Sequence, residues 1–422
     1  MKTERVRRKE VPAQADPLKD IKSTRGKELS GKRIVLCVTG SVASIESPAL
    51  ARELMRHGAE VFPVMSPAAT KLLRPALLEW ATGNPVVTSL TGKTEHVRLA
   101  GEWPGKAHLI LVAPCTANTI SKMAMGVDDT PATTFASMAL GSKIPLVICP
   151  AAHEPMYRNP SVDSNLSRLV DLGVEVVEPK FEEGKAKMAD VQTIVSKVMR
   201  RLAKRDLEGK RIMVTGGPTV EFIDPVRVIT NLSSGMMGLS LAEEAWRRGA
   251  NVYYVYGGGL RPPPFMKSKK ILTTGELRRA VLEELKRERY DAFISSAAPA
   301  DFAPVTQADR KIPSTAGELT LKLVPTKKIV GEVRNRWRRL YIASFKAETA
   351  NSSDELKRAA ERYIKESRVD MVVANNVSGG EVFGSSFNEV LILTRRRRLK
   401  VPHDLKDNVA RKILDVVAGE IR

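Results

Sequence analysis

A long run of glycine, serine and polar residues in the second half of the chain has the composition of a phosphate-binding site. It has the sequence TGGPTVEFIDPVRVITNLSSGMMG over residues 215–238. Its first glycines, Gly216 and Gly217, follow an apolar stretch and let the backbone approach a ligand closely, and exposed amides there can hold phosphate oxygens. The SSG triplet at 233–235 precedes a predicted helix that begins near Met236 and offers a second anion-binding end. The run therefore predicts a site that holds phosphate groups.

Three short segments of the first half carry small hydroxyl and amide side chains of the kind that surround a planar ring. They are TGSVAS at 39–44, SPAAT at 66–70 and APCTAN at 113–118, and a fourth segment, PAAH at 150–153, follows a predicted strand. A strand that ends in Gly-Ser exposes amides to a phosphate, and small polar side chains can hydrogen-bond a ring without crowding it. His96 adds a side chain that can move a proton near neutral pH. Each segment is a weak signal by itself.

Both groups of residues are positioned by the same kind of predicted unit. The segments GKRIVLCVTGS at 31–41 and GKRIMVTGGPT at 209–219 each place basic residues before a short apolar strand that ends in Thr-Gly. A helix and another strand follow in each case, and such alternation indicates βαβ units with a parallel sheet. The predicted fold class is therefore α/β, with two doubly wound, Rossmann-like parallel-sheet domains. Neither segment has the GxGxxG pattern, so an ordinary dinucleotide site is not indicated.

The remaining predicted elements continue this alternation. Those of the first half are strands at 108–113, 145–150 and 174–178 and a closing helix at 188–204. Those of the second half are strands at 291–296, 319–324, 340–344, 369–374 and 389–394 and a last helix at 403–420. The basic run Arg395–Arg398 lies between apolar stretches and is expected to be a hairpin turn, and the proline-rich segment 261–265 is expected to be a surface loop.

The length of the chain predicts two domains. It has 422 residues, and single hydrophobic cores stop growing at roughly 250–300 residues. The first 30 residues are polar and basic, and a second polar stretch separates the two halves. We expect a flexible basic tail at 1–30, a first domain at 31–203, a linker at 204–209 and a second domain at 210–422.

Charge and composition exclude several classes of protein. The net charge of +20 suggests a nucleic-acid partner, but the basic residues are spread along both halves, aromatic residues are 5%, and no stacking motif is present. No apolar run approaches the roughly 20 residues that cross a bilayer, and the start lacks the apolar stretch of a signal peptide. We therefore predict a cytoplasmic protein with no nucleic-acid or membrane partner. The three cysteines, Cys37, Cys115 and Cys149, are expected to be buried thiols.

The run at 215–238 resembles the signature of phosphopantothenate–cysteine ligases, whose pattern is roughly GPTxExxDPVRxxxNxSSG. Further blocks that resemble this family, in the same order, are SAAPADF at 296–302, RKI at 310–312, SFKAET at 344–349 and ANNVS at 374–378. The resemblance covers residues 209–420. It implies that the carboxylate of phosphopantothenate is first coupled to a nucleoside monophosphate, with release of pyrophosphate, and that the amine of cysteine then displaces the nucleotide.

The same resemblance implies roles for individual residues. Asn231 matches the asparagine that handles the acyl-nucleotide intermediate, and Lys311 matches the lysine that contacts the triphosphate. The other residues implied at the nucleotide are Gly216, Gly217, Ser295, Ser296, Ala297, Asp301, Pro325, Thr326, Lys327 and Phe345. Those implied at the acid substrate are Ser233, Ser234 and Gly235. CTP is the usual nucleotide of microbial members, ATP is the alternative, and Mg²⁺ is expected to be held mainly by phosphates; Met236 stands where the family often has lysine.

The segments of the first half together resemble the flavin-containing cysteine decarboxylases, in particular phosphopantothenoylcysteine decarboxylase, over residues 31–203. The resemblance implies FMN, which oxidises the thiol of the substrate so that CO₂ can leave and then returns the electrons. His96 matches the catalytic histidine, and His153 stands at the site of the substrate carboxylate. The residues implied at FMN are Gly40, Ser41, Ser44, Ser66, Thr116, Ala117 and Asn118.

The first half departs from this family at two places. The sequence PAAH at 150–153 replaces the Pro-Ala-Met-Asn of many members. The stretch 178–190 lacks the cysteine of the bacterial Ala-Cys-Gly flap, which helps to return hydrogen to the product, and it is similar to a shorter archaeal variant. How decarboxylation is completed without this thiol stays open.

The fused order of the two halves predicts a bifunctional enzyme of coenzyme A biosynthesis, because the product of the second half is the substrate of the first. Its substrates would be 4'-phosphopantothenate, cysteine and CTP. The resemblance also implies a large homo-oligomer, for example a dodecamer. One alternative is a flavin-binding regulatory protein whose decarboxylase half is inactive. A basic nucleic-acid-binding protein and a prenyltransferase-type flavoprotein are further alternatives, and the last leaves the second half unexplained.

Overall fold

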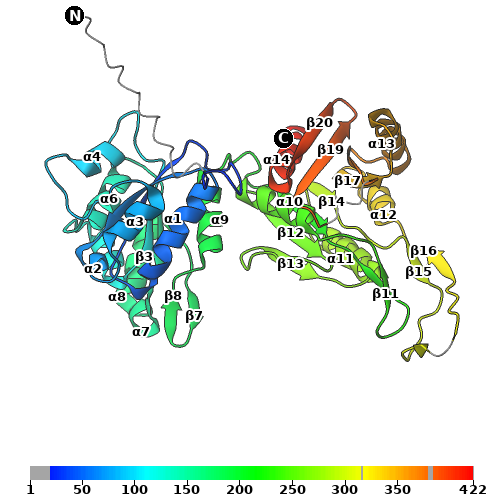
Figure 1. The fold of residues 1–422 in the computed structure, drawn as a ribbon, viewed down its shortest axis with the longest axis horizontal. Coiled ribbons are helices and arrows are strands. Elements are labelled where there is room, and N and C mark those ends of the chain that lie inside the picture. The colour runs from blue at the N-terminus through cyan, green and yellow to red at the C-terminus, as the bar shows by residue number, and fades with distance from the viewer. Residues whose placement is uncertain (1–19, 315–316, 379–383, 422) are drawn as a thin grey trace, which may run out of the picture. The chain divides into compact units, whose positions relative to one another are not determined.

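The computed structural model describes residues 20–314, 317–378 and 384–421, and these form two compact units. The first unit is Met1–Leu202 and the second is Ala203–Arg422. Each unit is built around its own sheet with helices on both faces (Figure 1). In the described parts of the chain, no helix combines the length and the apolar character that crossing a bilayer requires.

The sheet of the first unit has five parallel strands in the order β2-β1-β3-β4-β6. The strands are β1 (Arg33–Val38), β2 (Glu60–Met65), β3 (Leu109–Cys115), β4 (Leu146–Pro150) and β6 (Glu175–Val176). This is one of the common doubly wound orders, in which strand order reverses between β1 and β3. Ligands of such sheets bind outside the carboxyl ends of the strands at that reversal.

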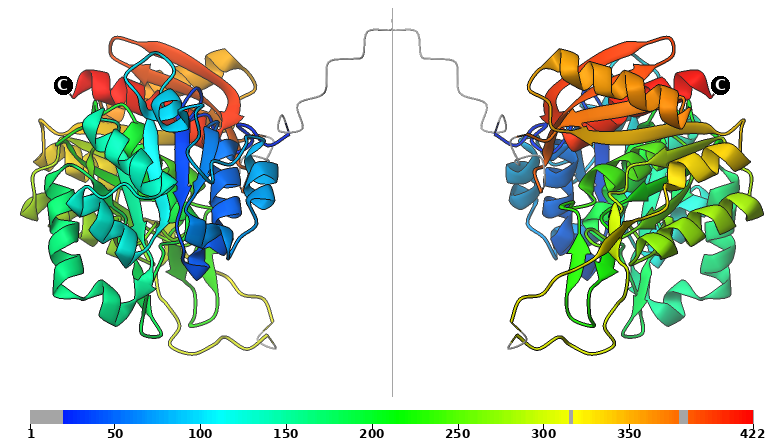
Figure 2. Two further views of the ribbon diagram at one scale, coloured as in Figure 1. Left: turned by 90° about the vertical axis from the view of Figure 1, so that its left-hand side faces the viewer. Right: turned by 90° about the vertical axis from the view of Figure 1, so that its right-hand side faces the viewer.

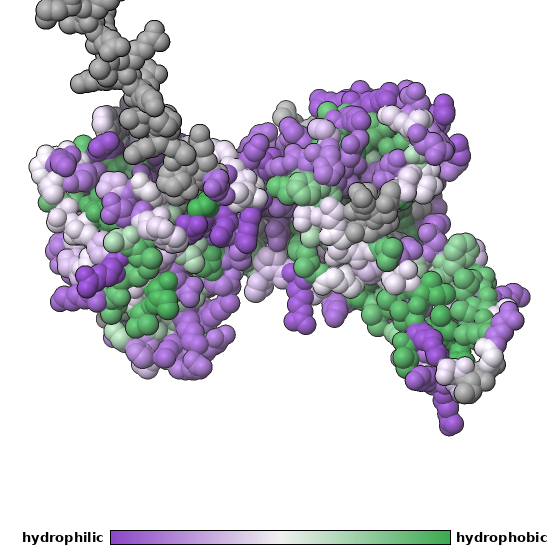
Figure 3. All heavy atoms as spheres, in the orientation of Figure 1, coloured by the Kyte–Doolittle hydropathy of each residue, from purple (hydrophilic) through white to green (hydrophobic). Residues whose placement is uncertain are grey.

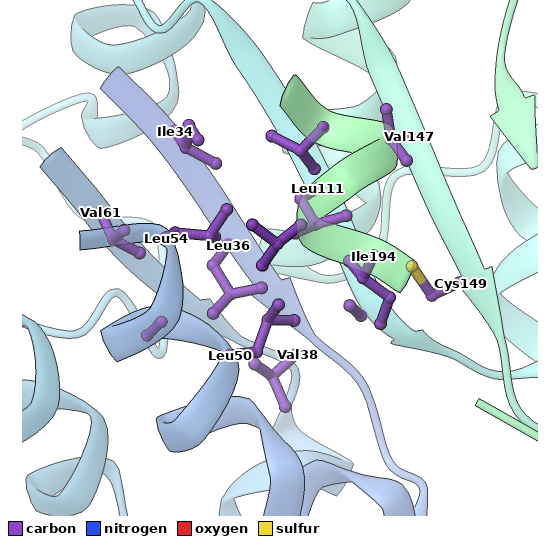
Figure 4. Packing of buried hydrophobic residues seen from close by; sticks show 14 of the residues in the cluster. Ile34, Leu36, Val38, Leu50, Leu54, Val61, Leu111, Val147, Cys149 and Ile194 are labelled. Atoms are coloured by element: carbon purple, nitrogen blue, oxygen red, sulfur yellow. The ribbon is translucent and has the colours of Figure 1, made fainter. Parts of the chain in front are cut away.

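Helices cover both faces of this sheet. They are η1 (Val42–Glu46), α1 (Ser47–Arg56), α2 (Pro67–Thr70), α3 (Pro75–Thr82), α4 (Glu95–Ala100), α5 (Ala117–Met125), α6 (Pro131–Gly141), α7 (Glu154–Tyr157), α8 (Pro160–Asp171) and α9 (Val191–Leu202). Alternate β1 residues face opposite sides, so Ile34 and Leu36 pack with α1 and α9 while Val35 and Cys37 pack with α5, α6 and α8. Figure 4 shows the first of these clusters. The three cysteines are buried, as predicted, and burial raises the pKa of each thiol.

The second unit has an eight-stranded sheet in the order β13-β12-β9-β14-β17-β18-β19-β20. The strands are β9 (Arg211–Gly216), β12 (Asn251–Tyr256), β13 (Lys267–Lys270), β14 (Ala292–Ser295), β17 (Tyr341–Glu348), β18 (Met371–Asn376), β19 (Phe387–Thr394) and β20 (Arg398–Leu405). The six strands from β13 to β18 in this order are parallel. When they are numbered along the chain, they have the Rossmann order 3-2-1-4-5-6, and the strand order reverses between β9 and β14. The predicted α/β fold class is confirmed in both units.

Among the described residues of the second unit, five helices flank its sheet. They are α10 (Met236–Arg247), α11 (Thr274–Arg287), α12 (Ile329–Arg336), α13 (Ser353–Ser367) and α14 (Lys406–Glu420). One face packs against α10 and α14, and the other against α11, α12 and α13. The antiparallel hairpin β19–β20 turns at residues 395–397, which confirms the predicted basic turn. Because β20 extends to Leu405, the last helix begins at Lys406 and not at the predicted residue 403.

Three small sheets lie outside the main ones. They are β10 (Val220–Phe222) with β11 (Val228–Thr230), β15 (Phe302–Pro304) with β16 (Leu323–Pro325), and β5 (Ala152–His153) with β8 (Lys185–Lys187) and β7 (Lys180–Glu182). The segment from β15 to β16, here called the arm (302–314 and 317–325), extends away from the main sheet of its unit, as the yellow segment of Figure 2 shows. The predicted strand at 319–324 is therefore wrong for most of its length, since only the short β16 forms, in the arm.

The described part of the predicted tail and the predicted linker are both packed against the protein. Leu29 is fully buried in the core of the first unit, and Arg25 Nη1 donates to Glu53 Oε1 at 2.7 Å. The prediction of a free tail is therefore wrong from residue 20 onward, and residues 1–19 lie outside the described part of the chain. In the second unit, Leu207 is fully buried in the core, so the predicted linker at 204–209 packs onto that unit. In both places apolar side chains packed into the core anchor a polar stretch, Leu29 with Ile21 in the first unit and Leu207 in the second.

Candidate active sites

A cavity of about 1330 Å³ opens at the carboxyl ends of β1 and β3 in the first unit. It lies where the strand order reverses, the place at which doubly wound sheets bind ligands. The predicted residues that line it are Gly40, Ser41, Ser66, Thr116, Ala117, Asn118 and His153. Ser44 is buried and is not among the described residues that line the cavity. Ligand pockets commonly have about 300–1000 Å³, so this cavity has room for a cofactor together with a second ligand.

Local hydrogen bonds shape the wall of this cavity. The hydroxyl of Thr39, at the end of β1, donates to the Pro114 carbonyl at 2.8 Å and accepts from the Thr116 amide at 3.1 Å, which ties the ends of β1 and β3 together. Thr116 in turn caps α5 by accepting from the amide of Thr119. A Cβ atom on Gly40 would lie 2.5 Å from Cβ of Ala68, so only glycine fits there. Small side chains, hydroxyls and open amides are the donor set that a flavin and its phosphate require.

His96 lies apart from these residues within one copy of the chain. It sits in the short helix α4 and is not among the described residues that line the cavity. Its Nδ1 atom is buried and has no hydrogen-bond partner in the described part of the chain. Buried polar atoms without a partner are rare and call for an explanation. The structure therefore does not bring the predicted catalytic histidine to the predicted flavin residues of its own copy.

The stretch 178–190 forms a hairpin that borders the same cavity. Strand β8 pairs with β5 on one side and β7 on the other. The hairpin and the residues that follow it add several side chains to the lining, namely Lys180, Lys185, Ala186, Lys187 and Met188. Sequence reasoning identified this stretch as a flap without cysteine but assigned no role to its lysines.

The second unit has a cavity of about 660 Å³ at the carboxyl ends of β9 and β14, again where strand order reverses. The predicted residues that line it are Asn231, Ser233, Ser234, Gly235, Ser295, Ser296, Ala297, Asp301, Thr326, Lys327 and Phe345. They come from segments that are more than 100 residues apart in the chain. Their convergence on one space is what a site for a nucleotide and a second anion requires.

Gly216 and Gly217 pack the protein instead of lining this cavity. A Cβ on Gly217 would lie 2.6 Å from the Gly258 carbonyl oxygen, and a Cβ on Gly238 of α10 would lie 2.7 Å from Cα of Gly216. The glycines thus allow α10 to approach the end of β9 closely. Neither is among the described residues that line the cavity, and the same holds for Pro325. The α10 terminus still faces the cavity through the SSG triplet at 233–235.

Polar contacts fix the side chains that do line the second cavity. Nδ2 of Asn231 donates to the Pro299 carbonyl at 2.9 Å, and Oγ of Ser296 donates to the Thr215 carbonyl at 2.6 Å. Asp301 forms an exposed ion pair with Lys328 at 2.6 Å. An exposed pair contributes little to stability and can open for a ligand. Asn231 is therefore held with its amide at the edge of the cavity.

Lys311 is exposed on the arm and is not among the described residues that line this cavity. The arm is nevertheless held at Ile312, midway along it, by the buried carboxylate of Asp224. Burial raises the pKa of Asp224, but amides of Val226, Arg227 and Ile312 and the guanidinium of Arg227 donate to it and bring the pKa down to about 2. Asp224, in the DPVR part of the signature, therefore has a structural role that sequence reasoning missed.

Comparison with known proteins agrees with these two halves. The family model described as "Flavoprotein" matches residues 22–203, and that described as "DNA/pantothenate metabolism flavoprotein C-terminal domain" matches residues 207–420. The coenzyme A biosynthesis bifunctional protein CoaBC of Thermococcus kodakarensis is 46% identical over 400 residues, covering 95% of this chain and 98% of its own. The protein of the same name from Methanocaldococcus jannaschii is 37% identical over 403 residues, covering 95% and 97%. The chain belongs to this family of bifunctional coenzyme A biosynthesis proteins.

Membership in this family confirms the predicted bifunctional enzyme of coenzyme A biosynthesis, with ligase and decarboxylase activities, and its first half is a flavoprotein domain. The alternative of a purely regulatory flavin-binding protein is not favoured. The Escherichia coli member is 34% identical over 411 residues, covering 92% of this chain and 97% of its own.

The ligase cavity also contains polar residues that sequence reasoning missed. Lys346 lines it with Nζ 3.1 Å from Glu348 and 5.8 Å from the ring centre of Tyr363. Lys406, the first residue of α14, is buried at the cavity wall, where burial lowers its pKa and Nζ donates to the Ser385 carbonyl at 2.5 Å. Lys346 lies inside the recognised SFKAET block, so a closer reading of that block could have found it. Lys406 lies outside every recognised block, so nothing in the sequence indicated its place in the cavity wall.

Proposed function

We propose that the second unit ligates 4'-phosphopantothenate to cysteine through an acyl nucleotide formed from CTP, and that the first unit decarboxylates the product with FMN. The observation that carries the ligase assignment is the convergence of Asn231, the SSG triplet, the SAAPAD segment and the SFKAET segment on one cavity. The observation that supports the decarboxylase assignment is the set of small polar residues around the larger cavity. In this order, the product of the ligation is the substrate of the decarboxylation.

In the ligase cavity, the carboxylate of the acid has to attack the α-phosphate of the nucleotide. Negative charge builds on phosphate oxygens during this step, so fixed donors and cations lower its barrier. Lys327 and Lys346 supply cations, and the amides of the SSG triplet at the start of α10 supply donors. Asn231 is placed to hold the acyl nucleotide while the amine of cysteine attacks.

A magnesium ion in this cavity would be held mainly by the nucleotide. Within residues 20–314, 317–378 and 384–421, no three His, Cys, Asp or Glu side chains come together as a metal site. The carboxylates of the lining are those of Asp301 and Glu366. Mg²⁺ binds nucleotide phosphates with one or two carboxylates and keeps several waters, which fits this sparse donor set.

In the decarboxylase cavity, FMN when bound accepts two electrons from the substrate thiol and later returns them. The residues of the chain hold the two ligands. The hydroxyls and amides near Gly40, Ser66 and Thr116 surround the ring and phosphate, and His153 faces the substrate carboxylate. His96 takes the role of the proton-transfer group, although it lies outside the cavity of its own copy.

A homo-oligomer explains why His96 and Lys311 both lie away from the cavities of their own copy. We infer that each reaches the cavity of a neighbouring copy, as part of a larger assembly such as a dodecamer. The arm offers a surface for the ligase half, because large apolar side chains gather on it and on the adjacent hairpin β10–β11 (Figure 3). These side chains are those of Phe302, Val305, Leu319, Leu321, Leu323, Val324, Val226, Val228 and Leu232. A monomer rarely leaves so much contiguous apolar surface exposed.

Charges placed on the arm are expected to split this assembly. The double substitution Phe302→Asp with Val324→Asp puts two carboxylates on the apolar surface, so light scattering should report a smaller particle. Ligase turnover should fall by about 10²-fold, because Lys311 no longer reaches a neighbouring cavity, while the flavin stays bound. Leu399→Asp, at an exposed apolar position of β20, is the matched control and should change neither quantity. An unchanged mass for the double variant would refute the arm as an interface.

A product assay tests the proposed function as a whole. Purified protein is mixed with 4'-phosphopantothenate, cysteine, Mg²⁺ and either CTP or ATP, and the products are followed by mass spectrometry. We expect 4'-phosphopantetheine, CMP and pyrophosphate with CTP and little product with ATP. Absence of phosphopantothenoylcysteine with both nucleotides would remove the ligase assignment, whereas its accumulation without phosphopantetheine would remove only the decarboxylase assignment.

A further inference from the structure

The flap hairpin of the decarboxylase half brings several cations to the edge of the flavin cavity. Lysines at 122, 180, 185 and 187 line this cavity. Three of them are already paired with carboxylates. Lys122 lies 2.5 Å from Asp129, Lys180 lies 2.8 Å from Asp190, and Lys187 lies 2.8 Å from Glu183.

Lys185 differs from the other three. Among the residues that the structure describes, no carboxylate lies within ion-pairing distance of its ammonium group. It is exposed at the cavity edge, where an anionic ligand could take up its charge. Lys185 is also the partner of Glu182 in the β7–β8 ladder, but the carboxylate of Glu182 lies 3.3 Å from Nζ of Lys187. Among the described residues that line the cavity, Lys185 is thus the lysine without an ion pair of its own, and sequence reasoning did not single it out.

The pairing of strands places Lys185 directly opposite His153. In the antiparallel ladder of β5 and β8, His153 is the partner of Lys185 and Ala152 is the partner of Ala186. Side chains directly opposite each other in such a ladder lie on the same face, with Cβ atoms about 4.5–5.5 Å apart. Both side chains line the cavity. Two nitrogen donors on the same face can both reach the oxygens of one carboxylate.

Several contacts hold the hairpin in this register. The ring of Phe181 on β7 packs edge-on against Tyr157 at 5.6 Å, and the guanidinium of Arg158 lies 5.3 Å from its centre. At the turn, the carbonyl of Gly184 accepts from the amide of Glu154 at 3.0 Å. These contacts tie β7 and the turn of the hairpin to α7 and Arg158, and the ladder with β5 holds β8, so the position of Lys185 beside His153 is fixed by the fold.

We propose that Lys185 binds the carboxylate of the decarboxylase substrate together with His153, as a second, charged ligand. The inference rests on the proposed decarboxylase function and adds a binding residue to it. An ammonium group and an imidazole together replace a single neutral amide at this site. Because the carboxylate loses its charge as CO₂ leaves, this contact is stronger in the ground state than later, so it acts on substrate binding and not on the rate of the chemical step.

The test compares two ligands that differ only in the carboxylate. Both are S-methyl compounds, phosphopantothenoyl-S-methylcysteine and S-methyl-phosphopantetheine, whose blocked sulfur cannot be oxidised. Calorimetry on the FMN-loaded full chain gives their dissociation constants. For Lys185→Gln we expect the dissociation constant of phosphopantothenoyl-S-methylcysteine to rise about tenfold, which is the scale of one charge-assisted hydrogen bond. The dissociation constant of S-methyl-phosphopantetheine should stay unchanged. In turnover assays, KM should rise by a similar factor while kcat does not fall.

The control is Lys143→Gln, an exposed lysine of the same unit that is not among the described residues that line the cavity, and both dissociation constants should stay near those of the unchanged protein. Equal weakening of both compounds by Lys185→Gln would show that Lys185 binds the phosphate, and no weakening of either would show that it touches neither group; both results overturn the proposal. If neither compound binds the unchanged holoenzyme, the proposed decarboxylase function itself fails. The double variant Lys185→Gln with His153→Gln should weaken binding of the acid by less than the product of the two single effects, because both residues hold one carboxylate.

Discussion

Replacing His96 with asparagine is expected to reduce CO₂ release by about 10²–10⁴-fold, the usual contribution of a positioned proton-transfer group. The purified variant should remain yellow, because His96 is not among the described residues that line the flavin cavity. Asparagine keeps a similar shape and a hydrogen-bonding group but cannot accept and release a proton near neutral pH. The measurement is the rate of CO₂ release from phosphopantothenoylcysteine, with flavin absorbance recorded on the same sample. Unchanged release would remove His96 from the mechanism.

Co-expression tests whether His96 acts in a neighbouring copy. Asn118→Trp should fill the cavity and exclude flavin while leaving His96 intact. If each site takes its cavity from one copy and its histidine from another, mixed assemblies of His96→Asn and Asn118→Trp chains should regain activity at about a quarter of the sites when chains mix at random. Either variant expressed alone is the control. No recovery in mixed assemblies would contradict the proposed exchange between copies.

Replacing Asn231 with aspartate is expected to slow ligation by about 10²–10³-fold, the scale of losing one fixed donor at a site of developing charge. The amide nitrogen of Asn231 donates to the Pro299 carbonyl, whereas aspartate would place a carboxylate against that carbonyl and beside the anionic ligands. The acyl nucleotide should then accumulate, because its reaction with cysteine is slowed more than its formation. Mass spectrometry of quenched reactions would detect it.

A matched exposed site separates this effect from added charge alone. Asn251→Asp, at the start of β12, introduces the same charge outside the cavity and should ligate at the normal rate. If Asn231→Asp formed product normally, or if cysteine consumed the acyl nucleotide as fast as in the unchanged protein, the assigned role of Asn231 would be wrong.

The fold was accessible from the sequence because hydrophobic periodicity marks buried parallel strands strongly. The same periodicity wrongly predicted a strand over 319–324. In that segment Leu319, Leu321 and Leu323 alternate with polar residues but lie exposed on the arm. Alternation indicates that one face of a segment will be covered, and it does not identify the covering surface. The proposed interface between copies accounts for this failure.

The residues of the two cavities were predicted where they follow strands at the reversal of each sheet, as Thr116 and Ser296 do. Gly216 and Gly217 lie outside the described lining of the cavity and pack closely against α10 and Gly258, because close approach of a helix or of another chain segment requires the same residue as close approach of a phosphate. Lys185 was missed because its importance depends on strand register, which places it opposite His153. Strand register between two segments that are distant in the sequence is a property of the folded chain and not of either segment.

The account as a whole depends on a nucleotide that makes the carboxylate of 4'-phosphopantothenate reactive in the ligase cavity. The most direct measurement uses acid labelled with ¹⁸O in that carboxylate, together with unlabelled CTP and cysteine, and weighs the nucleotide product by mass spectrometry. Attack of the carboxylate on the α-phosphate would leave one labelled oxygen in CMP. Label in inorganic phosphate, or CMP without label, would contradict the proposed chemistry.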